Sequence, residues 1–111
     1  MLSLPSSTRV YVYREAADMR SSFDKLSNLV SNILGKDPVS GHLFMFFNRV
    51  RTHVKVLYFD RTGYAIWYKR LERGTFSVPS QEEIGYREVV CILEGLKNVR
   101  KKLRYEGKSS V

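Results

Sequence analysis

The stretch Lys55-Val-Leu-Tyr-Phe-Asp-Arg-Thr-Gly-Tyr-Ala-Ile-Trp-Tyr-Lys-Arg-Leu-Glu-Arg-Gly-Thr-Phe76 decides the fold of this chain. Two runs rich in β-branched and aromatic residues flank a short turn at Asp60-Arg61-Thr62-Gly63, and this pattern predicts a β-hairpin. The second run ends in the cations Lys69, Arg70 and Arg73. The predicted hairpin therefore combines aromatic strands with a basic end.

Three further runs predict strands around this hairpin. Residues Arg9–Arg14 alternate β-branched and aromatic side chains, which is typical of a strand. Leu43–Phe47 is apolar throughout, which favours a central strand covered on both faces. Thr75–Val78 predicts a short edge strand that ends at Pro79, and such an edge offers a place for a second copy to pair. Because the connections from Leu43 onward are short, these strands should pair in an antiparallel meander.

Two helices are expected to cover the sheet. The first spans about residues 18–34, with Asp18 as its cap and Gly35 in the left-handed position after its last turn. Its apolar positions recur at three- and four-residue spacing, which defines one buried face; they are Met19, Phe23, Leu26, Leu29 or Val30, and Ile33. The second spans Arg87–Glu94, after a segment with the spacing of a capping box at residues 80–83.

These elements predict a single α+β domain over residues 1–95, with an antiparallel sheet of about four to five strands and two covering helices. Residues 96–111 form a basic tail, either helical or disordered. The formal net charge of the chain is +8 and its pI is about 9.8, which favours polyanionic partners. Much of that charge lies in the tail.

Several functional classes lack their signatures. No apolar run approaches the roughly 18–20 residues of a membrane span, and no secretory signal pattern precedes the domain. Cys91 is the single cysteine, so a reducing, cytoplasmic compartment is expected. Neither a phosphate-binding glycine motif nor zinc-ligand spacing occurs. We therefore expect no cofactor, no metal and no membrane association.

Carboxylates that could bind a catalytic divalent ion are Asp37, Asp60 and Glu72. Asp37 precedes a proline and Asp60 begins a turn, where aspartate is favoured for its local hydrogen bonding. Glu72 lies between cations that offer it an ion pair. The sequence thus favours a protein that is not an enzyme.

The basic residues form the better candidate site. The connection with Arg49 and Arg51 and the chain after residue 68 should fall at the same end of an antiparallel sheet. They either form one phosphate-binding patch or merely solvate a rim. The aromatic residues Tyr64, Trp67 and Tyr68 offer stacking surface where they are exposed, although Trp67 is better explained as core.

The chain resembles the small accessory protein, often called TnpB, of bacterial insertion-sequence family 66. The similarity covers most of residues 1–95 and rests on several motifs in order. They are Asp18-Met-Arg20 with Ser22-Phe23 and Leu26, Asp37-Pro38 with Ser40-Gly41-His42-Leu43-Phe44, Phe47-Asn48-Arg49, Lys55-Val-Leu57, Asp60-Arg61-Thr62-Gly63-Tyr64, Trp67-Tyr68-Lys69-Arg70-Leu71-Glu72-Arg73-Gly74-Thr75-Phe76 and Leu93-Glu94-Gly95.

This resemblance implies an accessory role beside a separate, large transposase, with no catalytic residues to transfer. Its motif cations have counterparts in Arg20, Arg49, Lys69, Arg70 and Arg73. Together with Arg51, these are the expected contacts to transposon-end DNA. The alternatives are an adaptor that binds the transposase or other proteins of the element without touching DNA, a nuclease that uses the three carboxylates, and an inactive remnant.

Overall fold

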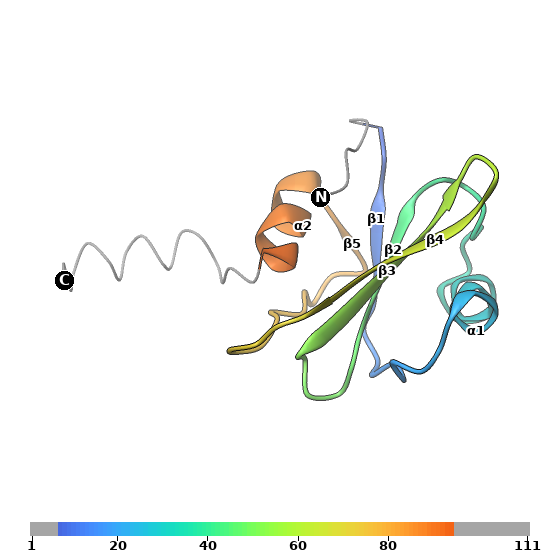
Figure 1. Cartoon of the computed structure of the whole chain (residues 1–111). Helices are drawn as coiled ribbons and strands as arrows, with labels where there is room; N and C mark the ends of the chain where they lie inside the picture. The colour runs from blue at the N-terminus through green and yellow to red at the C-terminus, as the bar shows by residue number, and fades with distance from the viewer. Residues whose placement is uncertain (1–6, 95–111) are drawn as a thin grey trace.

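The computed structural model describes residues 7–94 of the chain and has the expected α+β class (Figure 1). The predicted basic tail at residues 96–111 lies outside this described part. The elements in chain order are β1 (Val10–Tyr13), α1 (Phe23–Leu29), η1 (Val30–Leu34), β2 (Leu43–Phe47), β3 (His53–Asp60), β4 (Gly63–Arg70), β5 (Glu83–Ile84) and α2 (Tyr86–Leu93).

The strands form one mixed sheet in the order β4-β3-β2-β1-β5. The predicted antiparallel meander is confirmed for β2, β3 and β4, and the hairpin turns between Asp60 and Gly63 as expected. The pair β1–β2 is instead parallel, with Val10 opposite Leu43. Parallel neighbours need a long crossover, and residues 14–42, which contain α1, provide it.

The edge of the sheet differs from the prediction. Residues 75–78 form no strand, so the expected edge for a second copy is absent there, and Phe76 is buried instead. The edge beside β1 is β5, whose Glu83 lies opposite Tyr11. Residues 80–83, which have the spacing of a capping box, cap no helix, because Glu83 belongs to this strand and α2 starts after Gly85.

The first helix is shorter than predicted. It begins after Ser22, whereas Asp18, the predicted cap, accepts hydrogen bonds from Arg20 in the preceding turn. Its last turn is a π-helix, and this wider turn buries Val30 but leaves Ile33, a predicted core residue, exposed. Gly35 takes the expected left-handed conformation at the end, with φ of 66°.

The sheet lies between α1 on one face and α2 on the other (Figure 1). Because side chains alternate along a strand, each strand serves both faces. All five residues of β2 are buried, which confirms it as a central strand covered on both sides. Both helices are short, and within residues 7–94 no helix is long and apolar enough to cross a membrane.

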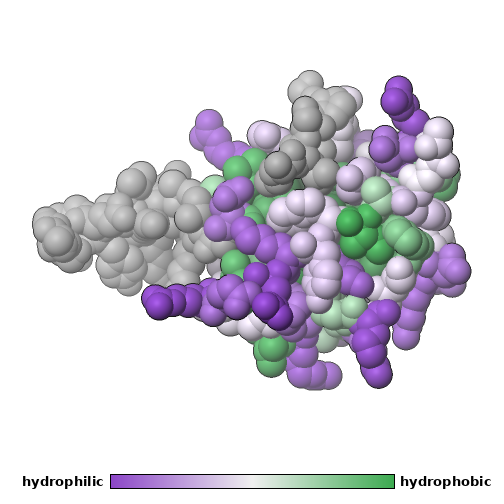
Figure 2. Space-filling view, in the orientation of Figure 1, coloured by the Kyte–Doolittle hydropathy of each residue, from purple (hydrophilic) through white to green (hydrophobic). Residues whose placement is uncertain are grey.

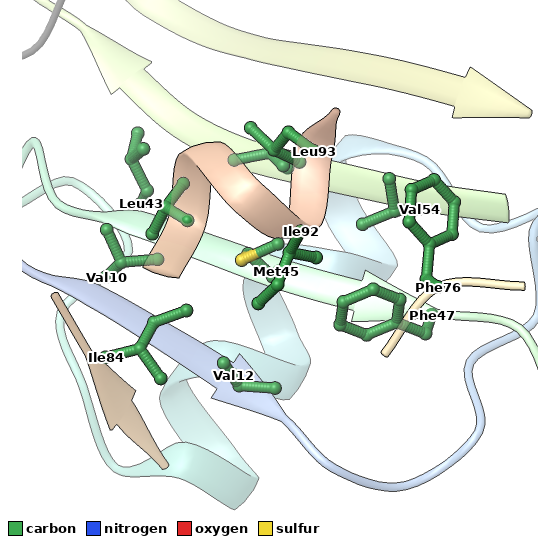
Figure 3. Packing of buried hydrophobic residues seen from close by; sticks show 12 residues of the cluster. Val10, Val12, Leu43, Met45, Phe47, Val54, Phe76, Ile84, Ile92 and Leu93 are labelled. Atoms are coloured by element: carbon green, nitrogen blue, oxygen red, sulfur yellow. The ribbon is translucent and has the colours of Figure 1, made fainter. Parts of the chain in front are cut away.

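Each face has its own apolar cluster. The α1-side cluster consists of Tyr11, Ala17, Leu26, Val30, Phe44, Phe46 and Leu57. The α2-side cluster, most of which is drawn in Figure 3, consists of Val10, Val12, Leu43, Met45, Phe47, Val54, Val56, Phe76, Ile84, Val89, Ile92 and Leu93. Trp67 is half-buried against the α2-side cluster, which supports its assignment to the core.

Phe76 reaches the α2-side cluster from an irregular segment. Its ring meets that of Phe47 edge to face, with 5.8 Å between the ring centroids (Figure 3). Its backbone N–H donates to the carbonyl oxygen of Arg51 at 2.7 Å. This residue therefore anchors the chain after β4 to the connection between β2 and β3.

Replacement of Phe76 by alanine should lower the free energy of unfolding by about 3–5 kcal/mol, because it leaves a cavity in a packed cluster. Equilibrium urea denaturation measures this change. The control is Tyr86→Ala on the exposed surface of α2, which should change stability by less than about 0.5 kcal/mol. A cost for Phe76→Ala as small as that of the control would show that the segment is not anchored as described.

Candidate nucleic-acid interface

Three segments leave the sheet at one end, the lower end in Figure 1: the chain after β1, the connection between β2 and β3, and the chain after β4. We call this region the basic end and define it as residues 14–16, 48–52 and 69–73. Its cations are Arg14, Arg49, Arg51, Lys69, Arg70 and Arg73, against the carboxylates of Glu15 and Glu72.

The opposite end of the sheet is close to neutral. Residues 7–9, 35–42, 60–63 and 85–88 carry the cations Arg9, Lys36, Arg61 and Arg87 and the carboxylates of Asp37, Asp60 and Glu88. On the face shown in Figure 2, hydrophilic side chains project along the margins and apolar side chains are confined to small spots between them. The positive charge of the described chain is thus concentrated at one end of the sheet.

Asn48 organises the turn that presents Arg49 and Arg51. Its side-chain oxygen accepts from the backbone N–H groups of Thr52, at 2.9 Å, and His53, at 3.0 Å. Its side-chain nitrogen lies 3.0 Å from the Thr52 hydroxyl and 3.1 Å from Nδ1 of His53. Sequence reasoning missed this role, although asparagine after a strand is a recognised turn former.

Arg51 has an unusual backbone. Its φ is 62°, a left-handed conformation that non-glycine residues rarely adopt. Its N–H donates to the carbonyl oxygen of Asn48, and its own carbonyl oxygen accepts from Phe76. Such strained backbones persist only where the surroundings over-determine them, and they are common at functional sites.

A shallow hollow of about 120 Å³ lies beside this turn, at the carboxyl ends of β1 and β2. Arg14, Arg49 and Arg51 line it together with Glu15, and Phe47 forms part of its wall. Arg14 is fixed by a hydrogen bond from its guanidinium to the carbonyl oxygen of Ser80. The hollow is therefore lined by three arginine residues, of which Arg14 was not among the predicted contacts.

The remaining cations of the basic end point in different directions. Lys69 faces α2 and donates through Nζ to the carbonyl oxygen of Leu93 at 2.8 Å, so it caps the carboxyl end of that helix. Arg70 faces α1, and its Nε lies 2.9 Å from the carboxylate of Glu72. Arg73 is exposed and, like Arg49 and Arg51, forms no ion pair within residues 7–94.

Arg20 lies apart from these residues, in the segment between β1 and α1. Its guanidinium pairs with the carboxylate of Asp18 at 2.7 Å. Hydrogen bonds from the side chain and the backbone N–H of Arg20 hold the pKa of Asp18 well below its usual range. Of the predicted cations, Arg20 is therefore the one most compensated by a local carboxylate.

A buried cation that sequence reasoning did not select lies on the α1 side of the sheet. Lys55 is in the middle of β3, directly opposite Tyr68 on β4, and its Nζ lies 5.0 Å from the centroid of the Tyr68 ring. The strand pattern gave no signal for this burial, because alternation places Lys55 on the face opposite Val54 and Val56, where a lysine is expected to be exposed.

The three carboxylates considered for metal binding do not meet. Asp60 and Glu72 lie at opposite ends of the hairpin, and the carboxylate of Asp37 accepts a hydrogen bond from the backbone N–H of Val39. Across residues 7–94, no three His, Cys, Asp or Glu side chains are grouped so that they could hold a metal ion.

Replacement of Asn48 by alanine should lower the free energy of unfolding by about 2 kcal/mol, because two backbone N–H groups lose their acceptor. Asn48→Asp keeps that acceptor and should cost less. Urea denaturation gives both values, and hydrogen exchange at Thr52 and His53 reports the turn itself. Equal losses for the two variants would contradict the assigned role of the side-chain oxygen.

The Asp18–Arg20 pair should make stability depend on pH. Since the pKa of Asp18 is lowered in the folded protein from an ordinary value of 3.8, its contribution is present above that value and is lost as the pH falls. Asp18→Asn should therefore destabilise the protein more at pH 7 than at pH 2. Glu15→Gln, which removes a carboxylate of the same segment that forms no ion pair within residues 7–94, is the control, and thermal unfolding at both pH values is the measurement. A difference that grows toward pH 2 would refute the pairing.

Comparison with known proteins shows to which family the chain is related. The family model of the IS66 Orf2 like protein matches residues 8–103. The chain is also similar to the protein named Uncharacterized protein y4hO of Sinorhizobium fredii (strain NBRC 101917 / NGR234), with 37% identity over 82 residues, which are 74% of this chain and 71% of that protein. No solved structure matches it. The chain therefore belongs to the IS66 Orf2-like family, and this membership suggests an accessory role associated with transposition.

Proposed function

We propose that this protein is a non-catalytic accessory factor for transposition that contacts the DNA of its insertion sequence through the basic end. The observation that carries the proposal is the grouping of Arg49, Arg51 and Arg73 at one end of the sheet, without an ion pair in the described chain. Arginine presents planar donors that match two phosphate oxygens at once.

The rigidity of the basic end supports this proposal. The Asn48 side chain and the Arg51–Phe76 backbone bond hold the turn in one conformation. A preorganised turn loses little conformational entropy when it binds, so more of the contact energy appears as affinity. Contacts of this kind bind phosphates and fix the position of the protein on the DNA. They do not recognise the base sequence.

The geometry also ranks the predicted contacts. Arg49, Arg51 and Arg73 lead, and Arg14 joins them through the shared hollow. Arg70 and Arg20 would have to share their charge with Glu72 and Asp18, and Lys69 already caps α2. We therefore assign the last three cations a smaller part in DNA contact.

A second candidate function is an adaptor for the transposase that makes no DNA contact. It is favoured by Val50, which is 63% exposed at the tip of the same turn, between Arg49 and Arg51. Arginine is enriched at protein interfaces, and Val50 adds exposed apolar surface between two arginines of the turn. A pull-down with the transposase in nuclease-treated extract distinguishes this function from bridging by DNA, and Val50→Asp should abolish the capture if the turn is the contact.

DNA contact is tested by fluorescence anisotropy with a transposon-end duplex at several salt concentrations. Arg49→Glu combined with Arg73→Glu should weaken binding at least tenfold. It should also reduce the slope of log affinity against log salt by about 2, since each lost phosphate contact removes about 0.9.

The matched control is Arg87→Glu, which reverses an exposed cation at the opposite end of the sheet. It should leave the affinity close to that of the wild type, apart from a small general effect of net charge. Equal losses in the control and the double variant would mean that the charge of the protein attracts DNA without a defined contact. Unchanged binding by the double variant would rule out the basic end as the interface.

A further inference from the structure

Lys55 carries a charge for which the described chain supplies no opposite charge. The residue is only 9% exposed, and its Nζ donates to the carbonyl oxygen of Ser21 at 2.7 Å. Within residues 7–94 no carboxylate lies within ion-pair distance of it. A buried ammonium group is costly unless it is paired, so an anion bound beside Lys55 would compensate its charge.

Tyr68 lies beside this charge and is accessible. The residue is 51% exposed, although it sits on a strand directly opposite a buried position. The Lys55 ammonium group lies over the ring at 5.0 Å from its centroid, and the ring of His53 lies 5.8 Å away at an angle of 32°. Lys55 therefore covers one face of the ring, and the free surface of Tyr68 is the part of the residue that remains exposed.

A second cation flanks the ring. Arg70 is two residues along β4 and therefore lies on the same face of the sheet as Tyr68, opposite His53. Its side chain is 65% exposed even with Glu72 beside it. The aromatic surface is thus bordered by a buried ammonium group on one side and an exposed guanidinium on another.

We propose that Lys55 and Tyr68 form a binding site for an unpaired nucleotide of single-stranded DNA. The base stacks on the free surface of Tyr68, and the adjoining phosphate contacts the exposed side chain of Arg70, while the buried charge of Lys55 attracts the phosphate without touching it. Bases stacked within a duplex hide their faces, whereas unpaired bases stack on exposed aromatic rings regardless of sequence. The inference rests on the proposed contact with DNA and deepens it, because it names an unpaired strand as a second substrate.

Fluorescence anisotropy with a labelled deoxythymidine 12-mer, which cannot form a hairpin, tests the site alongside the transposon-end duplex. Tyr68→Ala should weaken binding of the single strand by roughly 5- to 150-fold, the range for loss of one stacked base. Tyr68→Phe should bind like the wild type because it keeps the ring. Tyr86→Ala, which removes an exposed tyrosine on α2, is the control and should have no effect.

Lys55→Met separates a binding role from a structural one. It removes the charge but keeps a long apolar side chain, so the melting temperature of the free protein should not fall while affinity for the single strand drops at least fivefold. A lower melting temperature with unchanged binding would show that Lys55 serves the fold and would overturn the proposal.

The two DNA probes, the single-stranded 12-mer and the transposon-end duplex, allow this inference to fail separately from the proposed function. If Tyr68→Ala lowers the affinity for the single strand alone, the nucleotide site is supported, and contact with the duplex remains assigned to Arg49, Arg51 and Arg73. If the wild type binds the duplex but not the 12-mer, or if Tyr68→Ala affects both equally, the nucleotide site is wrong and the proposed function stands. Tighter binding of a uridine 12-mer of RNA than of the DNA strand would contradict the assignment to DNA.

Discussion

The parallel pairing of β1 with β2 is the constraint on which the rest of the structure depends. A parallel pair cannot be joined by a tight turn, so the chain must cross over the sheet, and α1 in that crossover covers one face. The same pairing brings the carboxyl ends of β1 and β2 together. Since β3 and β4 then run antiparallel, the start of β3 and the end of β4 join them at that end. The basic end is therefore a consequence of topology, because it collects segments that are far apart in the sequence.

The basic end combines exposed charge with a rigid backbone, two properties that are often hard to obtain together. Phosphate contact needs exposed charge, whereas a defined contact geometry needs a rigid backbone. The structure separates the two tasks: Asn48 and the buried ring of Phe76 hold the turn from within, and Arg49 and Arg51 project from it. Lys55 shows the same division on the α1 side, where a buried ammonium group borders an exposed aromatic ring. In the basic end, apolar packing by Phe76 thus supports the exposed charges, whereas at Lys55 a charge itself is buried.

Much of the architecture could be predicted from the sequence because the local signals agreed. The apolar run at Leu43–Phe47, the turn after Asp60 and the glycine at position 35 each had one sensible structural interpretation.

The errors arose where tertiary contacts decided between local alternatives. Thr75–Val78 has the composition of a strand, but Phe76 is buried in the core and its backbone N–H donates to Arg51 in a connection rather than to a strand. Asp18 is a good cap by type, yet its carboxylate accepts hydrogen bonds from Arg20 and the helix begins after Ser22. The cations of the site could be selected by residue type. Their contacts depend on three-dimensional geometry that sequence spacing does not encode: Arg70 pairs with Glu72, Lys69 caps α2, and Lys55 donates to a backbone carbonyl oxygen.

The central claim is that nucleic acid meets this protein at the basic end, and NMR titration of the isotope-labelled protein tests it most directly. Addition of a transposon-end duplex should shift the amide resonances of residues 48–52 and 69–76 first and furthest. The turn at residues 60–63 and the start of α2 should stay unchanged, because they lie at the near-neutral end of the sheet. Shifts concentrated at that opposite end, or spread evenly over the surface, would contradict the account.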